Sequence, residues 1–285
     1  MSLERSLQTL IENNMDIFLG VNFLATEFST TNGGRMDTLG IDENHSPVIV
    51  EYKRAINENV INQGLFYLDW LMDHRAEFEL LVMKKMGSDV AEKIEWTSPR
   101  LVCIAGEFTK FDSHAVNQIN RNIDLIRYRR FGEDLLLFEL VTATAAKNSM
   151  VGGGDLSQVG GGKEKVKYKT VSQNLAEADV SIRDLYEEIK QYMMALGDDV
   201  QEKILDMYIA FRRIKNFACI EIRNQLKVIR IYVKVNPDSI DLKDGFTRDV
   251  RNIGHFGTGD LEITISDKND FDAAKQLIER SYEQS

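Results

Sequence analysis

The stretch GRMDTLGIDENHSPVIVEYKR, residues 34–54, has the pattern of two β-strands joined by a short polar turn. The consecutive apolar residues at 48–50 are typical of a strand that is covered on both faces. Asp37, Glu51 and Lys53 nevertheless lie within the predicted strands. Because burying an unpaired charge is costly, these three residues are the first candidates for a functional site.

The geometry of a strand brings these charges together. Residues two apart point to the same face, so Glu51 and Lys53 share one face and Tyr52 lies on the other. A turn centred near Asn44 places Asp37 opposite Glu51 on the neighbouring strand. Two carboxylates and one ammonium leave a net negative charge, which a hard divalent cation such as Mg²⁺ would neutralise. The alternative is an ordinary salt bridge in a partly exposed hairpin.

The segment after the hairpin adds polar residues to this cluster. Gln63 and Tyr67 are four residues apart on a predicted helix, so they share one face, which we expect to lie toward the hairpin. Lys53, beside a cation, would stabilise the charge that develops on a phosphate group. The pattern thus favours phosphate chemistry at this position.

The whole chain divides into three parts. Residues 1–141 alternate helical and strand-like patterns and predict a mixed α/β domain. Residues 142–175 contain two glycine triplets and few large apolar residues, which indicates a flexible linker, with an ordered lid as the alternative. Residues 176–285 predict a separate α+β domain, an antiparallel meander with one helix at each end.

Composition limits the function. The 285 residues carry a formal net charge of −10, so any contact with phosphate must come from local basic patches. The candidates for such a patch are basic residues near strand ends: Arg54, Arg127, Arg129 and Arg130. A solvated strand end explains them equally well. No apolar stretch is long enough to cross a bilayer and no signal-peptide pattern begins the chain, so we expect a cytoplasmic protein with no membrane partner.

Residues 5–71 resemble the PD-(D/E)XK nuclease superfamily, in particular its NucS/EndoMS endonuclease branch. The shared layout is GR-x-D-x-L-G followed by V-x-V-E-x-K-R. The resemblance implies an α/β restriction-endonuclease-like core, with a mixed central sheet flanked by helices. It also implies that Asp37 and Glu51 bind Mg²⁺ or Mn²⁺, with the Tyr52 backbone carbonyl as a third ligand. Lys53 would be the catalytic lysine and Gln63 would support the site.

Two further assignments follow from the same resemblance. Tyr67 would line the site, and an acidic residue of the first helix would join it, with Glu12 as the candidate and Glu4 as the alternative. Residues 176–285 are similar to an uncharacterised α+β domain that is often attached to such cores, and no function follows from that likeness.

Three functional hypotheses remain open at this point. The first is a metal-dependent nuclease that hydrolyses phosphodiester bonds in DNA. The second is a non-catalytic module that retains the nuclease fold and binds a protein or a nucleic acid. The third is an RNA nuclease, because only contacts to the 2′-hydroxyl separate RNA from DNA. The acidic balance suggests that a homodimer or a protein partner assists binding.

Overall fold

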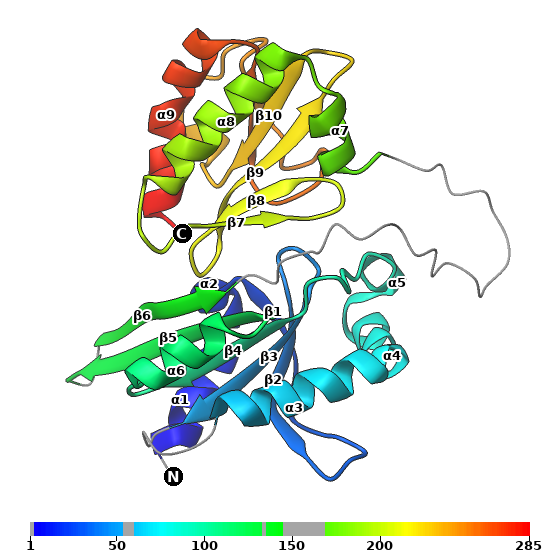
Figure 1. The fold of residues 1–285 in the computed structure, drawn as a ribbon, viewed down its shortest axis with the longest axis vertical. Helices are drawn as coiled ribbons and strands as arrows, with labels where there is room; N and C mark the ends of the chain where they lie inside the picture. The colour runs from blue at the N-terminus through cyan, green and yellow to red at the C-terminus, as the bar shows by residue number, and fades with distance from the viewer. Residues whose placement is uncertain (1–2, 54–59, 133–134, 145–168) are drawn as a thin grey trace, which may run out of the picture.

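The computed structural model describes residues 3–53, 60–132, 135–144 and 169–285, which form two domains (Figure 1). The N-terminal domain contains helices and strands in alternation. Its elements are α1 Leu3–Glu12, α2 Met15–Leu19, β1 Val21–Ser29, β2 Arg35–Asp42, β3 Pro47–Lys53, α3 Val60–Asp73, α4 Arg75–Met86, α5 Ser88–Ala91, β4 Arg100–Ala105, α6 Lys110–Asn117, β5 Asn122–Phe131 and β6 Leu135–Thr144.

The N-terminal domain is built around a six-stranded mixed sheet of order β1-β2-β3-β4-β5-β6. Strands β3, β4 and β5 are parallel, and the other pairings are antiparallel. The parallel pairs require crossover connections, which α3 to α5 and α6 supply. One hydrophobic cluster packs α3 and α4 on one face, and a second packs α1 and α2 on the other. The predicted mixed sheet flanked by helices is confirmed.

The hairpin has the predicted register. Thr38 pairs with Val50, and Ile41 pairs with Pro47, so the hairpin is centred on residue 44. Asp42 Oδ1 accepts hydrogen bonds from the backbone N–H groups of Asn44 and Ser46, both at 2.9 Å. These side-chain to backbone bonds fix the turn locally, as expected for an Asp at the start of a turn.

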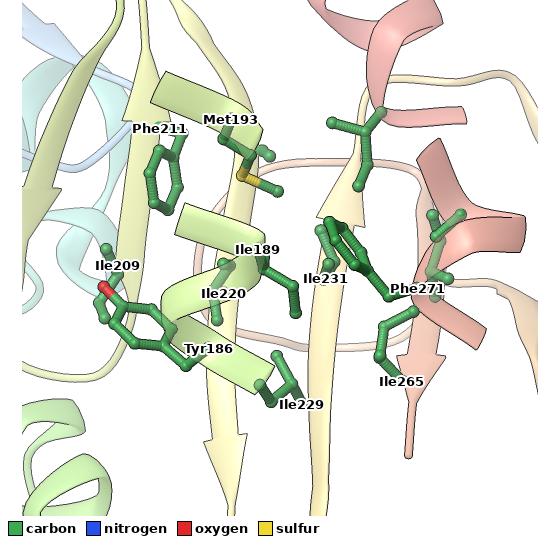
Figure 2. Packing of buried hydrophobic residues seen from close by; sticks show 14 of the residues in the cluster. Tyr186, Ile189, Met193, Ile209, Phe211, Ile220, Ile229, Ile231, Ile265 and Phe271 are labelled. Atoms are coloured by element: carbon green, nitrogen blue, oxygen red, sulfur yellow. The ribbon is translucent and has the colours of Figure 1, made fainter. Parts of the chain in front are cut away.

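The C-terminal domain is an antiparallel sheet covered by helices. Its elements are α7 Val171–Glu177, α8 Val180–Met194, β7 Gln201–Ile204, β8 Ile209–Arg212, β9 Asn216–Arg223, β10 Val228–Val233, η1 Pro237–Ser239, β11 Thr247–Asp249, β12 Leu261–Ile265 and α9 Lys268–Glu283. The six strands have the order β11-β12-β10-β9-β8-β7. In Figure 2, Ile189 of α8 and Phe271 of α9 pack against Ile220 and Ile231 of the sheet. The predicted α+β arrangement is confirmed: α8 precedes the strands β7 to β12 and α9 follows them, and both helices pack on the same face of the sheet.

The segment predicted as a linker is partly ordered secondary structure. Strand β6 continues to Thr144, and α7 begins at Val171. Thr170 caps α7, because its side chain accepts from the Gln173 N–H while the Gln173 side chain accepts from the Thr170 N–H. Val171 has no exposed surface. The capping box and the buried Val171 therefore show that the second domain begins within the stretch 142–175, before the predicted boundary at residue 176.

Buried charges join the two domains. Arg100 of β4 donates to Asp124 of β5 at 2.5 Å, and Arg212 of β8 donates to the same Asp124 oxygen at 2.9 Å. Arg100 also donates to the backbone carbonyl of Ile214 at 3.1 Å. Arg212 is therefore buried at the domain interface.

The hairpin turn is the second point of contact between the domains. Tyr208 and Asn216 of the C-terminal domain both donate to the Asn44 side-chain oxygen, at 2.8 and 2.7 Å. Glu43 accepts from the Asn216 N–H and pairs with Lys234. The C-terminal domain thus contacts the turn end of the hairpin, at the end opposite to Asp37 and Glu51. Within the described ranges, no helix is long and apolar enough to span a membrane.

Candidate active site

The candidate site lies where β2 and β3 part. The paired register of the hairpin reaches Thr38 and Val50, and its continuation places Asp37 across from Glu51. Here the side chains replace the backbone ladder, because Glu51 Oε1 accepts from the Asp37 N–H at 3.1 Å and Asp37 Oδ2 accepts from the Tyr52 N–H at 3.0 Å. Each carboxylate is therefore held by a backbone N–H of the opposite strand, Glu51 by β2 and Asp37 by β3.

Glu51 carries an electrostatic cost in this arrangement. Its side chain has no exposed surface, and its Oε2 has no hydrogen-bond partner among the described residues. Burial, followed by the charge of Asp37, raises the pKa of Glu51 to about 8. Burial also raises the pKa of Asp37, although the Tyr52 N–H and the charge of Lys53 act against it. A cation close to both carboxyl groups would remove this cost.

Lys53 completes the predicted cluster. It is the last residue of β3 and lies beside Ala105 in the parallel register with β4. The positive charge of Lys53 acts against the rise in the pKa of both Asp37 and Glu51, so the ammonium lies within electrostatic reach of both carboxyl groups. The structure thus brings the three ionisable residues of the hairpin together.

Helix α3 supports the site through Tyr67. The Tyr67 hydroxyl accepts from the Gln63 side chain at 3.1 Å and from the Arg35 N–H at 3.2 Å, two residues before Asp37. Gly34 makes this contact sterically feasible, because a Cβ at that position would lie 2.5 Å from the Tyr67 ring. Tyr67 is buried and therefore fixes the start of β2 rather than presenting a free hydroxyl to a ligand.

Glu12 lies on the other side of the sheet. It accepts hydrogen bonds from Thr38 Oγ1 at 2.6 Å and from Gln8 at 3.0 Å. Thr38 in turn contacts the Tyr52 hydroxyl, and the Tyr52 ring is buried in the cluster that packs α1 and α2. The structure therefore places Glu12 beside the hairpin but does not bring it to the two carboxyl groups. The side chain of the alternative, Glu4, lies outside the described residues.

The predicted basic patch is only partly available. Arg127 pairs with Glu107 and Glu139, each at 2.7 Å, so its charge is already neutralised. Arg129 is exposed, and Arg130 donates to the Gly132 carbonyl at 3.0 Å. Arg54 lies outside the described residues. A phosphate contact from Arg127 would require that its two ion pairs break.

Sequence reasoning missed one acidic residue, Glu27 of β1. The pairs Thr26 with Thr38 and Phe28 with Met36 place Glu27 across from Asp37. Its φ of +49° is rare and strained for a residue with a side chain.

Glu27 also forms an ion pair with Arg35 at 2.8 Å, and its charge acts to raise the pKa of Asp37. The sequence signal was present, because Glu27 is a charged residue in the strand-like stretch VNFLATEF, residues 21–28. The irregular register between Phe23 and Ala25 hid its partner on β2.

The metal-binding capacity of the site rests on few protein ligands. Across the described ranges, no group of three or more His, Cys, Asp or Glu residues has the geometry to hold a metal ion. Asp37 and Glu51 are the two carboxyl groups that the hairpin brings together. Mg²⁺ is commonly held by one or two carboxylates, with the remaining ligands coming from water, backbone oxygens or substrate phosphate.

Comparison with known proteins gives matches for both halves of the chain. Residues 171–285 match the family model described as a domain of unknown function, DUF5655. An uncharacterized protein of Haemophilus influenzae is 29% identical over 282 residues, which are 98% of this chain and 92% of that protein.

Two solved structures resemble part of the chain. A complex of EndoMS with double-stranded DNA matches 46% of this chain and 48% of its own, with 20% identity and a TM-score of 0.33. A repair endonuclease from Pyrococcus abyssi matches 45% of this chain and 48% of its own, with 17% identity and a TM-score of 0.31. This chain thus spans about half the length of each of these solved structures.

Proposed function

We propose that this chain is a divalent-metal-dependent nuclease that hydrolyses phosphodiester bonds in DNA through Asp37, Glu51 and Lys53. The observation that carries the proposal is the parting of β2 and β3, where two carboxyl groups share one gap beside a lysine. Glu51 Oε2 is buried there without a hydrogen-bond partner in the described part of the chain. A buried, incompletely paired carboxylate is typical of a site that awaits a ligand.

The residues present fit Mg²⁺ or Mn²⁺. Carboxylate oxygens are hard ligands, which these cations prefer over nitrogen or sulfur. Asp37 and Glu51 would hold the ion, with the Tyr52 carbonyl as the third protein ligand that the sequence predicts. Glu51 Oε2 gives this set an oxygen to which no donor among the described residues is hydrogen-bonded.

The protein's own groups have distinct tasks in this proposal. A bound divalent cation supplies Lewis acidity toward the phosphodiester. Lys53 places a positive charge beside the carboxyl groups, where it stabilises negative charge that develops on the phosphate oxygens. Tyr67, held by Gln63, fixes the start of β2 and so keeps Asp37 in position. Arg35 is exposed at the edge of the site and paired with Glu27, so a contact from Arg35 to the DNA backbone would require that this ion pair break.

The test is cleavage of labelled single-stranded, duplex and branched DNA, and of a matched RNA, at low salt with Mg²⁺ or Mn²⁺. The full chain is compared with Asp37→Asn, Lys53→Ala and a surface control, Lys84→Ala in α4. We expect metal-dependent cutting of DNA that falls on the order of a hundredfold or more in the two site variants and is unchanged in the control. Cutting that survives in both site variants places the chemistry elsewhere.

A second measurement separates an absent substrate from an absent activity. Calorimetric titration with Mn²⁺ measures binding directly, without any nucleic acid. Binding that Asp37→Asn weakens supports the metal site even when none of the chosen substrates is cut. If the unmodified protein binds no Mn²⁺ and cuts no substrate, the nuclease proposal fails and a non-catalytic role takes its place.

A further inference from the structure

A cavity of about 390 Å³ lies between the two domains. Four segments line it: the hairpin turn 43–45, the segment 92–95, the β7–β8 turn 205–208 and the loop 255–257. It adjoins the turn end of the hairpin, whereas Asp37 and Glu51 lie at the opposite end. Domain boundaries are frequent locations of small-molecule sites, and this volume lies within the usual range.

The walls of the cavity are held by hydrogen bonds from both domains. Tyr208 donates to Asn44 at 2.8 Å across the domain boundary. The Glu95 N–H donates to the His45 carbonyl at 2.9 Å, and the Phe256 N–H donates to Glu221 at 3.1 Å. The cavity is therefore formed by fixed segments, which lowers the entropic cost of binding a ligand.

The charge of the lining is negative. One ammonium, Lys93, and four carboxylates line the cavity: Glu43, Glu92, Glu95 and Asp206. Glu43 already has a counter-charge in Lys234. Glu95 and Asp206 come from different domains, and no ion pair to either is found within the described ranges. Burial, followed by the charge of Glu95, raises the pKa of Asp206.

His255 has a ring nitrogen, Nε2, that makes no hydrogen bond in the described part of the chain. Its Nδ1 lies 2.9 Å from the Ile253 carbonyl, which only accepts, so Nδ1 carries the proton in the neutral ring. Nε2 is then an acceptor, and it is buried with no hydrogen-bond partner in the described part of the chain. The ring stacks on Tyr232 at 4.4 Å, which fixes its orientation.

Apolar surface accompanies the acidic groups. Phe256 is 41% exposed although it lines the cavity, and Met207 lies on the same wall. Aromatic faces attract cations, and thioether side chains adapt to short apolar chains. The acidic lining repels phosphate, so this cavity is not an extension of a nucleic-acid site.

We propose that the interdomain cavity binds a small organic cation, an amine or guanidine on a short apolar stem. Its charged end would lie between Glu95 and Asp206, and its stem would pack against Phe256 and Met207. The shared chemistry of the ligand is a compact cation with several N–H donors and an apolar body. The proposal does not depend on nuclease activity.

The test is calorimetric titration of the full chain with butylguanidine and with its uncharged isostere, butylurea. We expect butylguanidine to bind with a dissociation constant on the order of 1 mM, as suits a ligand of this size, and butylurea to bind at least about tenfold more weakly. Asp206→Asn and Glu95→Gln should each weaken butylguanidine about tenfold, since each removes one carboxylate. Asp244→Asn, the same change on an exposed loop, should leave the affinity unaltered.

Three results would overturn the proposal. Butylurea that binds as well as butylguanidine would show that charge is not recognised. The ligand would lie elsewhere if the Asp206→Asn and Glu95→Gln proteins unfold at the same temperature as the parent and bind butylguanidine with the same affinity. A blocked Gly-Arg-Gly peptide that binds far more tightly than butylguanidine would identify a protein side chain, not a small molecule, as the occupant.

Discussion

Two buried carboxyl groups of the same sheet, Glu51 in β3 and Asp124 in β5, lie in opposite electrostatic surroundings. Burial and Asp37 raise the pKa of Glu51 to about 8. Burial opposes the ionisation of Asp124 as well, but Arg100 and Arg212 outweigh it and hold the pKa of Asp124 below its ordinary value. The domain interface thus contains its own counter-charges, whereas the candidate active site leaves negative charge for a ligand to neutralise.

This difference separates a buried charge that is paired within the protein from one that is only partly paired. A charged residue within an apolar strand is the sequence signal in both places. Only the number of partners distinguishes them, since Asp124 has two arginines and Glu51 has an oxygen with no partner in the described part of the chain. Substitutions that remove a charge should therefore change the free energy of unfolding in opposite directions at the two places. Loss of a counter-charge of Asp124 should lower it, whereas loss of the charge of Glu51 should raise it.

The largest effect is expected at the interface. Arg100→Met removes one of the two counter-charges of Asp124 and leaves the Ile214 carbonyl without this donor. Breaking a buried ion pair costs about 3–5 kcal/mol, so the free energy of unfolding should fall by that order in urea denaturation. Arg127→Met, which breaks exposed ion pairs, should cost less than about 1 kcal/mol. Equal losses in the two variants would mean that the buried network is not stabilising.

The next largest effect is expected at Glu51, where a substitution should raise the free energy of unfolding instead of lowering it. Because the folded pKa of Glu51 is raised, the folded state binds more protons between about pH 4.5 and 8, and stability from this group is lost as pH rises through that window. Glu51→Gln cannot lose that proton, so it should raise the free energy of unfolding at pH 8 by at least about 1 kcal/mol. At pH 4 the two proteins should be equally stable.

Thermal unfolding from pH 4 to 9, with and without Mg²⁺, measures this prediction. Mg²⁺ should stabilise the parent protein at pH 8 and leave Glu51→Gln unchanged, because the variant lacks a carboxylate ligand. Glu187→Gln on the exposed side of α8 is the control for loss of charge. If Glu51→Gln is less stable than the parent at pH 8, Glu51 resembles Asp124 and the comparison fails.

A smaller effect is expected at Tyr67. Tyr67→Phe removes the hydroxyl that accepts from the Arg35 N–H and from Gln63. Loss of one such buried acceptor costs about 1 kcal/mol of unfolding free energy. Because the start of β2 then loosens, cleavage should fall about tenfold at unchanged Mn²⁺ affinity. Tyr192→Phe, which breaks a hydrogen bond to Glu279 in the other domain, should not change cleavage.

The smallest effect concerns backbone strain beside Asp37. Glycine in a strand normally costs about 0.5–1 kcal/mol, so Ser29→Gly in β1 should destabilise the protein by that amount. Glu27 has a φ of +49°, which glycine adopts without strain. Glu27→Gly should therefore be at least about 0.5 kcal/mol less destabilising than Ser29→Gly in the same denaturation experiment. The reverse order would show that the Glu27–Arg35 pair outweighs the strain.

Several features of the site were predictable from local patterns. The alternation in the hairpin and a turn centred near Asn44 placed Asp37 opposite Glu51, and the structure has that register. The i, i+4 spacing placed Gln63 and Tyr67 on one face of α3, where they share a hydrogen bond. These predictions hold because strand alternation, turn hydrogen bonds and helical spacing involve residues close in sequence.

Other features depend on which surfaces pack together. The first helix could cover either face of the sheet, and only its packing places Glu12 beside Thr38 and away from Asp37. The polar sequence of β7 carries no apolar alternation, so its strand forms through pairing with β8. Neither outcome is encoded by residues near in sequence, since each depends on a partner that is known only after the fold has formed.

The sequence by itself determined the hairpin, the meeting of Asp37, Glu51 and Lys53, and the class of each domain, because short-range periodicity specifies these. Tertiary structure alone decided that Arg212 neutralises Asp124, 88 positions away along the chain, and that Asn44 bonds to Asn216. It also decided that a cavity with acidic walls lies between the domains. Contacts of such long sequence separation follow from the shapes of two completed surfaces, and no local pattern specifies how those surfaces meet.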